Sequence, residues 1–498
     1  MAKEQEQKII DKYTVEADEI KASVSIVQDP NEYVPIYKIT FPKVELATST
    51  VLDTIREKIV NLMTFKTEET MSKYEMEKAK KKFFYEALKL IKEEIPNLSE
   101  KEQKNLAGTL LHESMGLGPL EMLLADVLLE EIVINNSEEP VWVYHIKYGW
   151  LKTNIKIPLE TKIYNYASQI GRKIGVQINN LNPLMDAHLT TGDRANATLF
   201  PISSNGNTLT IRKFARKPWT ITDFIADGTI SVDAAAFLWL ATQYELNIII
   251  AGGTASGKTS LLNALTCFIP PNQRIISIED TREIQLPKFL HWVPLTTRQP
   301  NPEGKGEVTM LQLMINSLRM RPDRIIVGEI RRSREAEVLF EAIHTGHSVY
   351  ATLHANTAEE TFRRLTNPPI NLPTTLLSSL QLIVVTHRDR RRQIRRILEI
   401  TELIPSGGLE EVKIELNTVF RWNPSTDKIV QIEDSRRVWN DIKLFTGMDN
   451  KAIANDLEDK KRILRWLVEK KIDDINEVGK IVSDYYVNPK TVLDRIKK

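Results

Sequence analysis

A glycine-rich octapeptide is the clearest chemical signal in this chain. Residues 252–259 have the sequence GGTASGKT, which fits the pattern G-x-x-x-x-G-K-[ST]. The expected phosphate-binding residues are Gly252, Gly253, Thr254, Ala255, Ser256, Gly257, Lys258, Thr259 and Ser260. Backbone N–H groups in such a loop turn toward phosphate oxygens, and a helix that begins there adds partial positive charge. We expect ATP in this loop, with Lys258 on the β- and γ-phosphates and the Thr259 hydroxyl on Mg²⁺.

The flanking residues support this interpretation. Residues 246–251 (LNIIIA) form a short apolar run that is typical of a buried strand, and residues 260–265 (SLLNAL) are typical of the first turns of a helix. A strand before the loop and a helix after it are the context that the motif requires. A chance glycine turn before a helix is the alternative, and it would not account for both flanks.

Two other apolar segments end in carboxylates. Residues 324–329 (RIIVGE) end in Glu329, the only carboxylate at that end, and we expect it beside Thr259 and the metal. Residues 274–278 run into the acidic sequence EDTRE, in which Glu279 or Glu283 could polarise the attacking water. We favour Glu279 because it is nearest the strand end. The alternatives are a surface glutamate at position 329 and a helix cap made by the aspartate at position 280.

Histidines stand at both ends of residues 347–354. Two of the eight histidines in the chain, His347 and His354, bracket one expected strand, and we expect them to sense the γ-phosphate or to hold the acids in place. Ordinary hydrogen-bonded core histidines are the alternative. Joint metal ligation is the weaker option, because residues seven apart in a strand point to opposite faces and lie more than roughly 20 Å apart.

The elements that position these residues alternate between strands and helices. A helix is expected near 232–244, and strands are expected at 246–251, 274–279, 324–329, 347–353 and 381–386. This alternation predicts an α/β fold with a mostly parallel sheet covered on both faces, and the functional residues belong at the carboxyl ends of its strands. Further edge strands are expected at 396–403 and 412–421, followed by charged helices over 435–498.

The N-terminal half has another pattern. Residues 48–95 and 102–130 look helical; short strands follow between 132 and 151, a helix near 161–174 and further strands up to 214. The expected organisation is an N-terminal helical, variable region (1–100), an α+β N-terminal domain (101–216), a linker (217–231), the ATPase core (232–410) and C-terminal strands and helices (411–498).

Composition limits the class of protein. The 498 residues include 67 Lys and Arg against 66 Asp and Glu, so a net charge of +1 supplies no overall field for nucleic acid. The single cysteine, Cys267, makes neither an internal disulfide nor a cysteine zinc cluster, which suits a reducing, cytoplasmic setting. No run approaches the roughly 18 apolar residues of a membrane span, and the first eight residues lack the apolar core of a signal peptide.

Four motifs together resemble the type II/type IV secretion ATPase superfamily. The phosphate loop, IEDTRE (278–283), RPDRIIVGEIR (321–331) and TGHSVYATLHANT (345–357) occur in its order and are similar to its Walker A, Asp box, atypical Walker B and His box. In the N-terminal half, residues 186–196 and 209–214 are similar to its N-terminal domain motifs. The resemblance covers about residues 120–405.

This resemblance implies a RecA-like ATPase that hydrolyses ATP with Mg²⁺ as a homohexamer at the cytoplasmic base of a secretion or pilus machine. By resemblance, Arg194 and Arg212 are arginine fingers, and Arg331 anchors the active site or the subunit interface. The implied partners are a polytopic membrane platform protein and other cytoplasmic motor components. The N-terminal domain would swing over the core, with residues near 215–231 as the hinge.

Two features resemble the archaeal branch, which drives archaella and archaeal type IV pili. The tetracysteine zinc insertion of the bacterial type II enzymes is absent, so no zinc is expected. Residues 140–151 (PVWVYHIKYGWL) and the charged C-terminal helices also look most like the archaeal proteins.

Two other functions are compatible with the sequence. A nucleic-acid motor is suggested by the basic run 388–396 (RDRRRQIRR), but this run holds no aromatic residue on which bases could stack, so nucleic acid is not expected as a partner. A subunit, an acidic partner or anionic lipid fits it better, and a solvated connection between strands is the simplest interpretation. The second alternative is a nucleotide-gated scaffold with little turnover, against which Glu279 and Glu329 argue.

Overall fold

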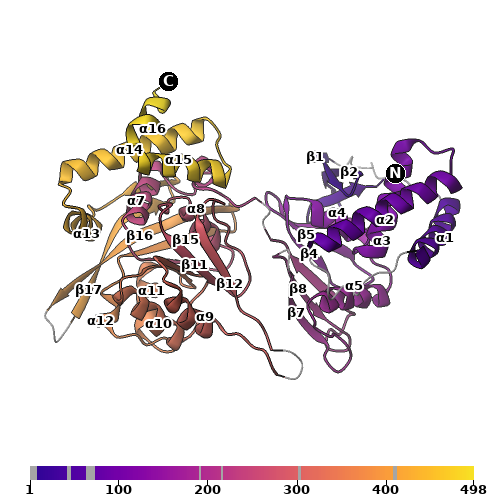
Figure 1. Ribbon diagram of the computed structural model, residues 1–498, viewed down its shortest axis with the longest axis horizontal. Coiled ribbons are helices and arrows are strands. Elements are labelled where there is room, and N and C mark those ends of the chain that lie inside the picture. Colours follow the sequence, from indigo (N-terminus) through magenta and orange to yellow (C-terminus); the bar gives the residue numbers. More distant parts are fainter. Residues whose placement is uncertain are drawn as a thin grey trace. The chain divides into compact units, whose positions relative to one another are not determined.

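The computed structural model describes residues 8–41, 46–62, 73–189, 192–214, 217–300, 304–407 and 412–497. The chain divides into two compact units (Figure 1). The described residues up to 214 belong to unit 1, and those from 217 onward belong to unit 2.

A nine-stranded sheet is the framework of unit 1. Its strand order is β1-β2-β3-β6-β5-β4-β9-β8-β7, and β3 and β6 form its parallel pair. The strands are β1 (Lys8–Ala17), β2 (Ile20–Gln28), β3 (Ile36–Thr40), β4 (Leu129–Ile134), β5 (Pro140–His145), β6 (Gly149–Lys156), β7 (Leu184–His188), β8 (Arg194–Thr198) and β9 (Thr208–Arg212). The helices are α1 (Leu46–Leu62), α2 (Lys73–Glu94), α3 (Glu100–Met115), α4 (Leu120–Ala125) and α5 (Glu160–Lys173).

Residues 8–40 differ from the expected helical, variable region. They form β1, β2 and β3, which extend the same sheet that carries β4–β9. Tyr13 and Tyr37 donate hydrogen bonds of 2.8 and 2.7 Å to Asp126, so these strands are fastened to the part of the chain that begins after residue 100. The β1–β2 turn uses Asp18 and Glu19 in left-handed conformations, with no glycine to mark it.

The sheet of unit 2 is parallel at one end and antiparallel at the other. Its order is β12-β11-β13-β14-β10-β15-β16-β17-β18; strands β10–β15 pair in parallel, and β15–β18 pair antiparallel. The strands are β10 (Ile248–Gly252), β11 (Arg274–Glu279), β12 (His291–Thr296), β13 (Arg324–Val327), β14 (Ser348–Leu353), β15 (Leu382–Asp389), β16 (Ile394–Gly407), β17 (Val412–Asn423) and β18 (Lys428–Gln431).

Helices cover both faces of this sheet, so the expected α/β core with a mostly parallel sheet is confirmed. They are α6 (Ile221–Ala226), α7 (Val232–Gln243), α8 (Lys258–Thr266), α9 (Met310–Ser317), α10 (Ser333–His344), α11 (Ala358–Thr366), α12 (Thr374–Leu377), α13 (Arg437–Thr446), α14 (Asn450–Glu469), α15 (Ile475–Val487) and α16 (Pro489–Ile496). In Figure 1, α7 and α13–α16 lie above the sheet of unit 2, and α9–α12 lie below it.

Strand β10 shows how the sequence specifies two buried faces. Ile248 and Ile250 pack into the core beneath α7 and α14, whereas Ile249 and Ala251 pack into the core that contains α10. Side chains alternate between the faces of a strand, so a strand buried on both sides is apolar throughout. This burial places the end of β10, where the phosphate loop begins, at the centre of unit 2.

Residues 217–231 do not form the free linker that the sequence suggested. They include α6, and their apolar side chains Ile221, Phe224 and Ile230 are buried in the core of unit 2. The Thr222 hydroxyl also donates a hydrogen bond of 2.8 Å to the carbonyl of Ile472. The glycine at 228 follows a short buried helix instead of marking a hinge, because the apolar residues around it have a core to enter.

The C-terminal helices are fastened to α7 through a buried cation. The Lys460 side chain of α14 is fully buried and pairs with Asp456. Its ammonium group lies 5.5 Å from the ring centroid of Trp239 on α7 and 5.1 Å from that of Tyr485 on α15. Charge pairing and aromatic faces together offset part of the cost of burying the ammonium group.

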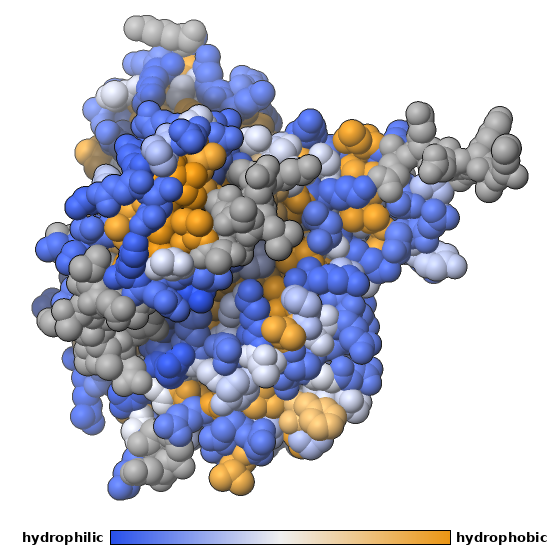
Figure 2. Space-filling model, turned by 90° about the vertical axis from the view of Figure 1, so that its right-hand side faces the viewer, coloured by the Kyte–Doolittle hydropathy of each residue, from blue (hydrophilic) through white to orange (hydrophobic). Residues whose placement is uncertain are grey.

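The surface mixes hydrophilic and apolar groups. Figure 2 shows one face that is mostly hydrophilic, with separate apolar patches. In unit 1 the exposed large apolar side chains include Leu181, Leu184, Phe200 and Ile202. Within the described residues, no helix combines the length and the apolar character that crossing a membrane requires.

Lys460 gives the stability of the protein a pH dependence. Burial lowers its pKa to about 8, whereas the ordinary value is 10.5. Between pH 8 and pH 10.5 the unfolded chain binds more protons than the folded one, so the free energy of unfolding rises with pH. The rise is about 3 kcal/mol over this pH range. We expect the thermal midpoint of the wild type to rise relative to that of Lys460→Met between pH 8 and pH 10. Lys461→Met, at a neighbouring partly exposed ion pair, should keep the rise. Parallel midpoints for wild type and Lys460→Met would contradict the assignment.

Candidate nucleotide site

Four neighbouring strands bring the predicted residues to one edge of the sheet in unit 2. In the order β11-β13-β14-β10, their carboxyl ends lead into Glu279, Glu329, His354 and the phosphate loop. The strands are parallel, so these ends lie side by side. Residues that are up to 102 positions apart in the sequence therefore form one site.

The phosphate loop is supported by a neighbouring strand. Its Ser256 hydroxyl donates to the carbonyl of Gly253 (2.8 Å) and lies 2.7 Å from the hydroxyl of Thr386 on β15. Gly252 has no room for a side chain, because a Cβ there would lie 2.2 Å from the Thr386 oxygen. Gly257 has φ +97°, a conformation that glycine adopts without strain, and α8 begins at the next residue.

The remaining loop residues lie where the motif predicts. Thr254 and Ala255 are exposed at the tip of the loop, and Ala255 is left-handed with φ +58°. Thr259 and Ser260 lie in the first turn of α8, with Thr259 half-buried and Ser260 exposed. Together these residues open the loop toward solvent at the helix N-terminus, where an anion is stabilised.

Lys258 is buried and folded back onto the loop. Its ammonium group donates to the carbonyl oxygens of Gly252 (2.9 Å) and Gly253 (3.1 Å), and it lies 3.3 Å from Nδ1 of His354. Burial lowers the pKa of Lys258, and the nearby Glu329 opposes that effect. In this structure the two carbonyl oxygens are the hydrogen-bond partners of the ammonium group. They hold it at the loop, where it would bind phosphate.

Of the carboxylates that act on the pKa of Lys258, Glu329 has the larger charge effect. One oxygen accepts a hydrogen bond from Arg331 (2.8 Å), and the other lies 3.4 Å from Nε2 of His354. Burial alone would raise the pKa of Glu329, but the hydrogen bond and charge of Arg331 outweigh it and lower the pKa. For His354, burial first and the charge of Lys258 second lower the pKa. At neutral pH the site therefore favours an ionised Glu329 beside a neutral His354.

Glu279 lies in a much drier environment. It is only 2% exposed, and its Oε1 accepts hydrogen bonds of 2.9 Å from the backbone N–H groups of Glu283 and Ile284. Its Oε2 is buried without a hydrogen-bond partner among the described residues. Burial raises the pKa of Glu279 to about 7. A carboxyl group with this pKa can exchange a proton near neutral pH, which suits a general base.

Asp280 differs from its suggested helix-cap role. No helix follows it; its carboxylate accepts a hydrogen bond of 2.6 Å from Arg331, which also binds Glu329. Arg331 thus joins the acids at the ends of β11 and β13. Neither this role of Asp280 nor the support that Thr386 gives the phosphate loop is predicted by the sequence. Position alone carried no signal for either, because both contacts come from strand neighbours distant in sequence.

The two histidines are not brought together. His354 follows β14 at the edge that holds Lys258 and Glu329, whereas His347 precedes β14 at the opposite end. Nδ1 of His347 lies 3.0 Å from the carbonyl of Ala342 and 3.0 Å from the Thr345 hydroxyl, at the end of α10. His347 therefore fits a local structural role, and the geometry gives it no contact with the acids or Lys258.

Arg194 and Arg212 are neighbours in unit 1. They are directly opposite each other in the antiparallel β8–β9 pair, and both are exposed. Arg194 forms an ion pair with both carboxylate oxygens of Asp186. The charge of Arg212 acts on Glu131, its cross-strand neighbour on β4, against a burial effect that raises the pKa of that carboxyl. Two guanidinium groups thus share one face of the sheet.

The donor set fits Mg²⁺ better than a transition metal. Thr259 offers a hydroxyl and Glu329 a carboxylate, and oxygen ligands are those that Mg²⁺ prefers. No group of three or more His, Cys, Asp or Glu side chains suited to a metal occurs within the described ranges.

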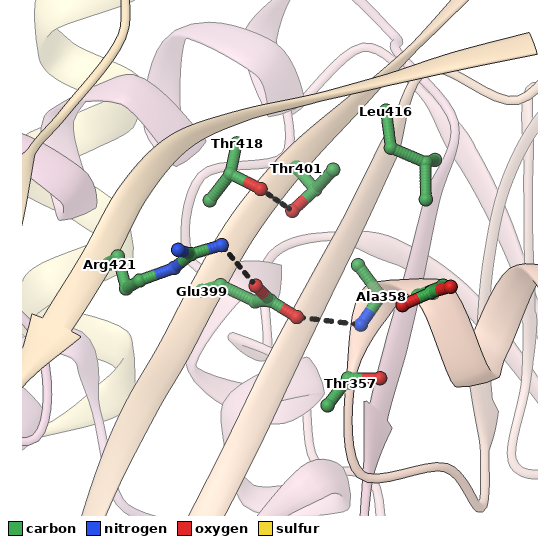
Figure 3. A pocket seen from close by; sticks show the side chains of 8 residues that line it. Thr357, Ala358, Glu399, Thr401, Leu416, Thr418 and Arg421 are labelled. Carbon is green, nitrogen blue, oxygen red and sulfur yellow. Dashed lines mark hydrogen bonds and ion pairs between the residues drawn. The ribbon is translucent and has the colours of Figure 1, made fainter.

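A separate cavity of about 450 Å³ lies between the start of α11 and the β16–β17 ribbon (Figure 3). Glu399 lies between Ala358 and Arg421, accepting a hydrogen bond of 2.7 Å from the backbone of Ala358 and one of 3.4 Å from Arg421. Its lining residues are Thr357, Ala358, Glu359, Glu399, Thr401, Leu416, Thr418 and Arg421. None of them belongs to the phosphate loop or to the acids at the strand ends. The cavity is therefore separate from the candidate nucleotide site at the carboxyl ends of the parallel strands.

Known proteins similar to this chain include secretion-system proteins and uncharacterized archaeal proteins. Residues 167–438 match the family described as Type II/IV secretion system protein. Uncharacterized protein MJ0900 of Methanocaldococcus jannaschii is 36% identical over 396 residues, covering 78% of this chain and 71% of that protein. Putative conjugal transfer protein MT3759 of Mycobacterium tuberculosis is 32% identical over 310 residues, covering 59% and 87%. The VirB11 ATPase of the Brucella suis type IV secretion system, solved with sulphate, is 27% identical with a TM-score of 0.30, covering 57% and 91%.

The crowding at Gly252 predicts a specific loss of nucleotide binding. In Gly252→Ala the new methyl group would overlap both the hydroxyl and the backbone oxygen of Thr386, so the loop must shift. We expect ADP affinity, measured by calorimetry, to fall on the order of 10- to 100-fold, which corresponds to about 1–3 kcal/mol of overpacking strain. Gly346→Ala is the matched control, because it also puts an alanine at a positive φ (+92°) but nothing lies within 4 Å of a Cβ there. Wild-type affinity in Gly252→Ala, or an equal loss in both variants, would contradict this account.

Proposed function

Because this chain belongs to the type II/IV secretion system protein family and is an ATPase of that family, we propose that it is the motor of an archaeal filament machine, an archaellum or a type IV pilus. The observation that carries the ATPase site is the convergence of Lys258, Glu279, Glu329 and His354 at one sheet edge, next to the phosphate loop. Relatives from an archaeon, among them MJ0900, support the archaeal assignment.

The residues divide the work of hydrolysis between them. Lys258 binds the β- and γ-phosphates after leaving its two carbonyl partners. Glu279 accepts the proton of the attacking water on Oε2, the oxygen that makes no hydrogen bond within the described residues. His354 lies between Lys258 and Glu329, from where it senses the γ-phosphate. Arg331 holds the carboxylates of Glu329 and Asp280 in position.

Thr259 and Glu329 are the residues that would hold Mg²⁺, Glu329 either directly or through water. When bound, this cation neutralises phosphate charge in the manner common to P-loop enzymes. The ion pair with Arg331 keeps Glu329 ionised, which is the form that a cation site requires.

Assembly into a ring completes the proposal. Arg194 and Arg212 are arginine fingers of a homohexamer, and a guanidinium supplies a permanent charge and a planar fork for phosphate oxygens. Arg194 would exchange its ion pair with Asp186 for phosphate. The hexamer works in the cytoplasm beneath the membrane, bound to a polytopic platform protein and to other cytoplasmic motor components.

A DNA-translocating motor is the second candidate. It is favoured by the similarity to a protein named as a putative conjugal transfer protein. The basic run that might bind DNA contains no aromatic residue for stacking. We therefore place filament assembly first.

The pKa of Glu279 predicts the pH profile of hydrolysis. A general base works only when it is deprotonated, so kcat/KM for ATP should rise through pH 7 and level off above it. Glu279→Gln should lower turnover on the order of 10²- to 10⁴-fold while leaving ADP affinity nearly unchanged. Glu283→Gln is the control: it should keep the rate, and because the charge of Glu283 contributes to the raised pKa of Glu279, it should move the inflection only slightly to lower pH. A Glu279→Gln enzyme that retains wild-type turnover and inflection would rule out this base.

The cellular function can be tested with a chromosomal Lys258→Ala replacement in the source organism. Loss of the phosphate-binding ammonium group should abolish surface filaments in electron micrographs, while the protein remains present by immunoblot. A second strain carrying Lys461→Ala, a lysine of α14 that pairs with Asp233 on α7, should keep its filaments. Normal filaments in the Lys258→Ala strain, with loss of DNA transfer between cells, would instead support the conjugation motor.

A further inference from the structure

The basic run at 388–396 does not act as one patch, because the structure gives its members different partners. The Arg396 side chain is largely buried and pairs with Asp427 (2.8 Å) and Asp227 (3.7 Å). Arg392 contacts Asp389 and the carbonyl of Pro424. Arg395 differs from both of these, because its side chain lies on the phosphate loop.

The contact of Arg395 with the loop is direct. Its Nε donates a hydrogen bond of 3.1 Å to the carbonyl of Ala255, the left-handed residue at the loop tip. Its Cδ lies 3.6 Å from the position that a Cβ on Gly257 would take, immediately before α8. The guanidinium group is thus held at the point where the loop meets the helix N-terminus, which attracts anions.

Hydrogen bonds fix the backbone at Arg395. The start of its side chain therefore has a defined position beside the phosphate loop. The carbonyl of Arg395 accepts hydrogen bonds from the Thr229 hydroxyl (3.1 Å) and from the Arg396 side chain (2.7 Å). Two residues after Arg395, the backbone N–H of Ile397 donates to the carbonyl of Thr229 (2.8 Å). Segment 227–230, which the sequence suggested as a linker, therefore locks the start of β16 beside the phosphate loop.

We propose that Arg395 is a phosphate-binding residue of the nucleotide site in its own subunit, and that it exchanges the Ala255 carbonyl for phosphate oxygens when nucleotide binds. A neutral carbonyl engages one of the five donors of a guanidinium, whereas phosphate oxygens form shorter and stronger charge-assisted bonds. Lys258 also rests on loop carbonyls, so both cations of the loop are positioned for the same exchange. This inference rests on the ATPase activity and not on the filament role.

The test separates a phosphate contact from a structural support of the loop. Full-length Arg395→Lys, Arg395→Gln and Arg395→Met are compared with Arg391→Gln, which removes one charge from the same hairpin. The probes are ADP, measured by calorimetry, and inorganic pyrophosphate, measured by displacement of a fluorescent ADP analogue. Thermal midpoints without nucleotide show whether each variant is folded.

We expect Arg395→Gln and Arg395→Met to weaken both ADP and pyrophosphate on the order of 10-fold, in line with the loss of one charge-assisted hydrogen bond. Arg395→Lys should recover part of that loss, and Arg391→Gln should change affinity less than 2-fold. Pyrophosphate reports phosphate binding alone, because it carries no base.

Three results would overturn the proposal. A loss in Arg395→Met with normal affinity in Arg395→Gln would show that a neutral hydrogen bond to Ala255 suffices. A loss for ADP with unchanged pyrophosphate affinity would indicate contact with the base or sugar. Equal losses in Arg395→Gln and Arg391→Gln would indicate only the general charge of the hairpin.

Discussion

The buried ammonium group of Lys258 is the constraint on which the ATPase unit depends. Removing a cation from water costs several kcal/mol unless oxygen atoms replace the lost hydration. Here the carbonyls of Gly252 and Gly253 take that place, with the carboxylate of Glu329 nearby. Those oxygens come from the ends of two strands, so the charge is tolerated only when the sheet has brought them together. Phosphate oxygens can replace these carbonyl oxygens as partners of the ammonium group. The site can therefore accept an anion without a change in the main chain of the loop.

The rest of the unit keeps these groups from relaxing. Strand β10 is buried on both faces, so the loop that follows it starts from a rigid point. Thr386 holds the loop from the next strand, and Arg331 joins the acids on the other side of the site. Glu279 remains without full hydrogen bonding in a dry pocket, and that environment is what raises its pKa into the range useful for proton transfer.

The sequence predicted those elements that a short run of residues specifies by itself. The phosphate loop and the parallel strands were found because motif, apolar runs and alternation agree within short windows. Strands β1–β3 were missed, since charged residues on their exposed faces and a turn without glycine hide the alternation. Strand β12 contains Pro294 at the sheet edge, which weakens its signal. The roles of Asp280, Thr386 and Arg395 were not predictable, because each depends on which strands are neighbours in the sheet. His347 and His354 belong to one sequence motif, but they lie at opposite ends of β14.

A structure of the full chain with ADP bound tests the central claim most directly. The account predicts that the ammonium group of Lys258 leaves the carbonyl oxygens of Gly252 and Gly253 and binds a phosphate oxygen. The main chain of the loop and the contact between Ser256 and Thr386 should stay unchanged. Nucleotide bound away from this loop, or a refolded loop in which Lys258 keeps its carbonyl partners, would contradict it.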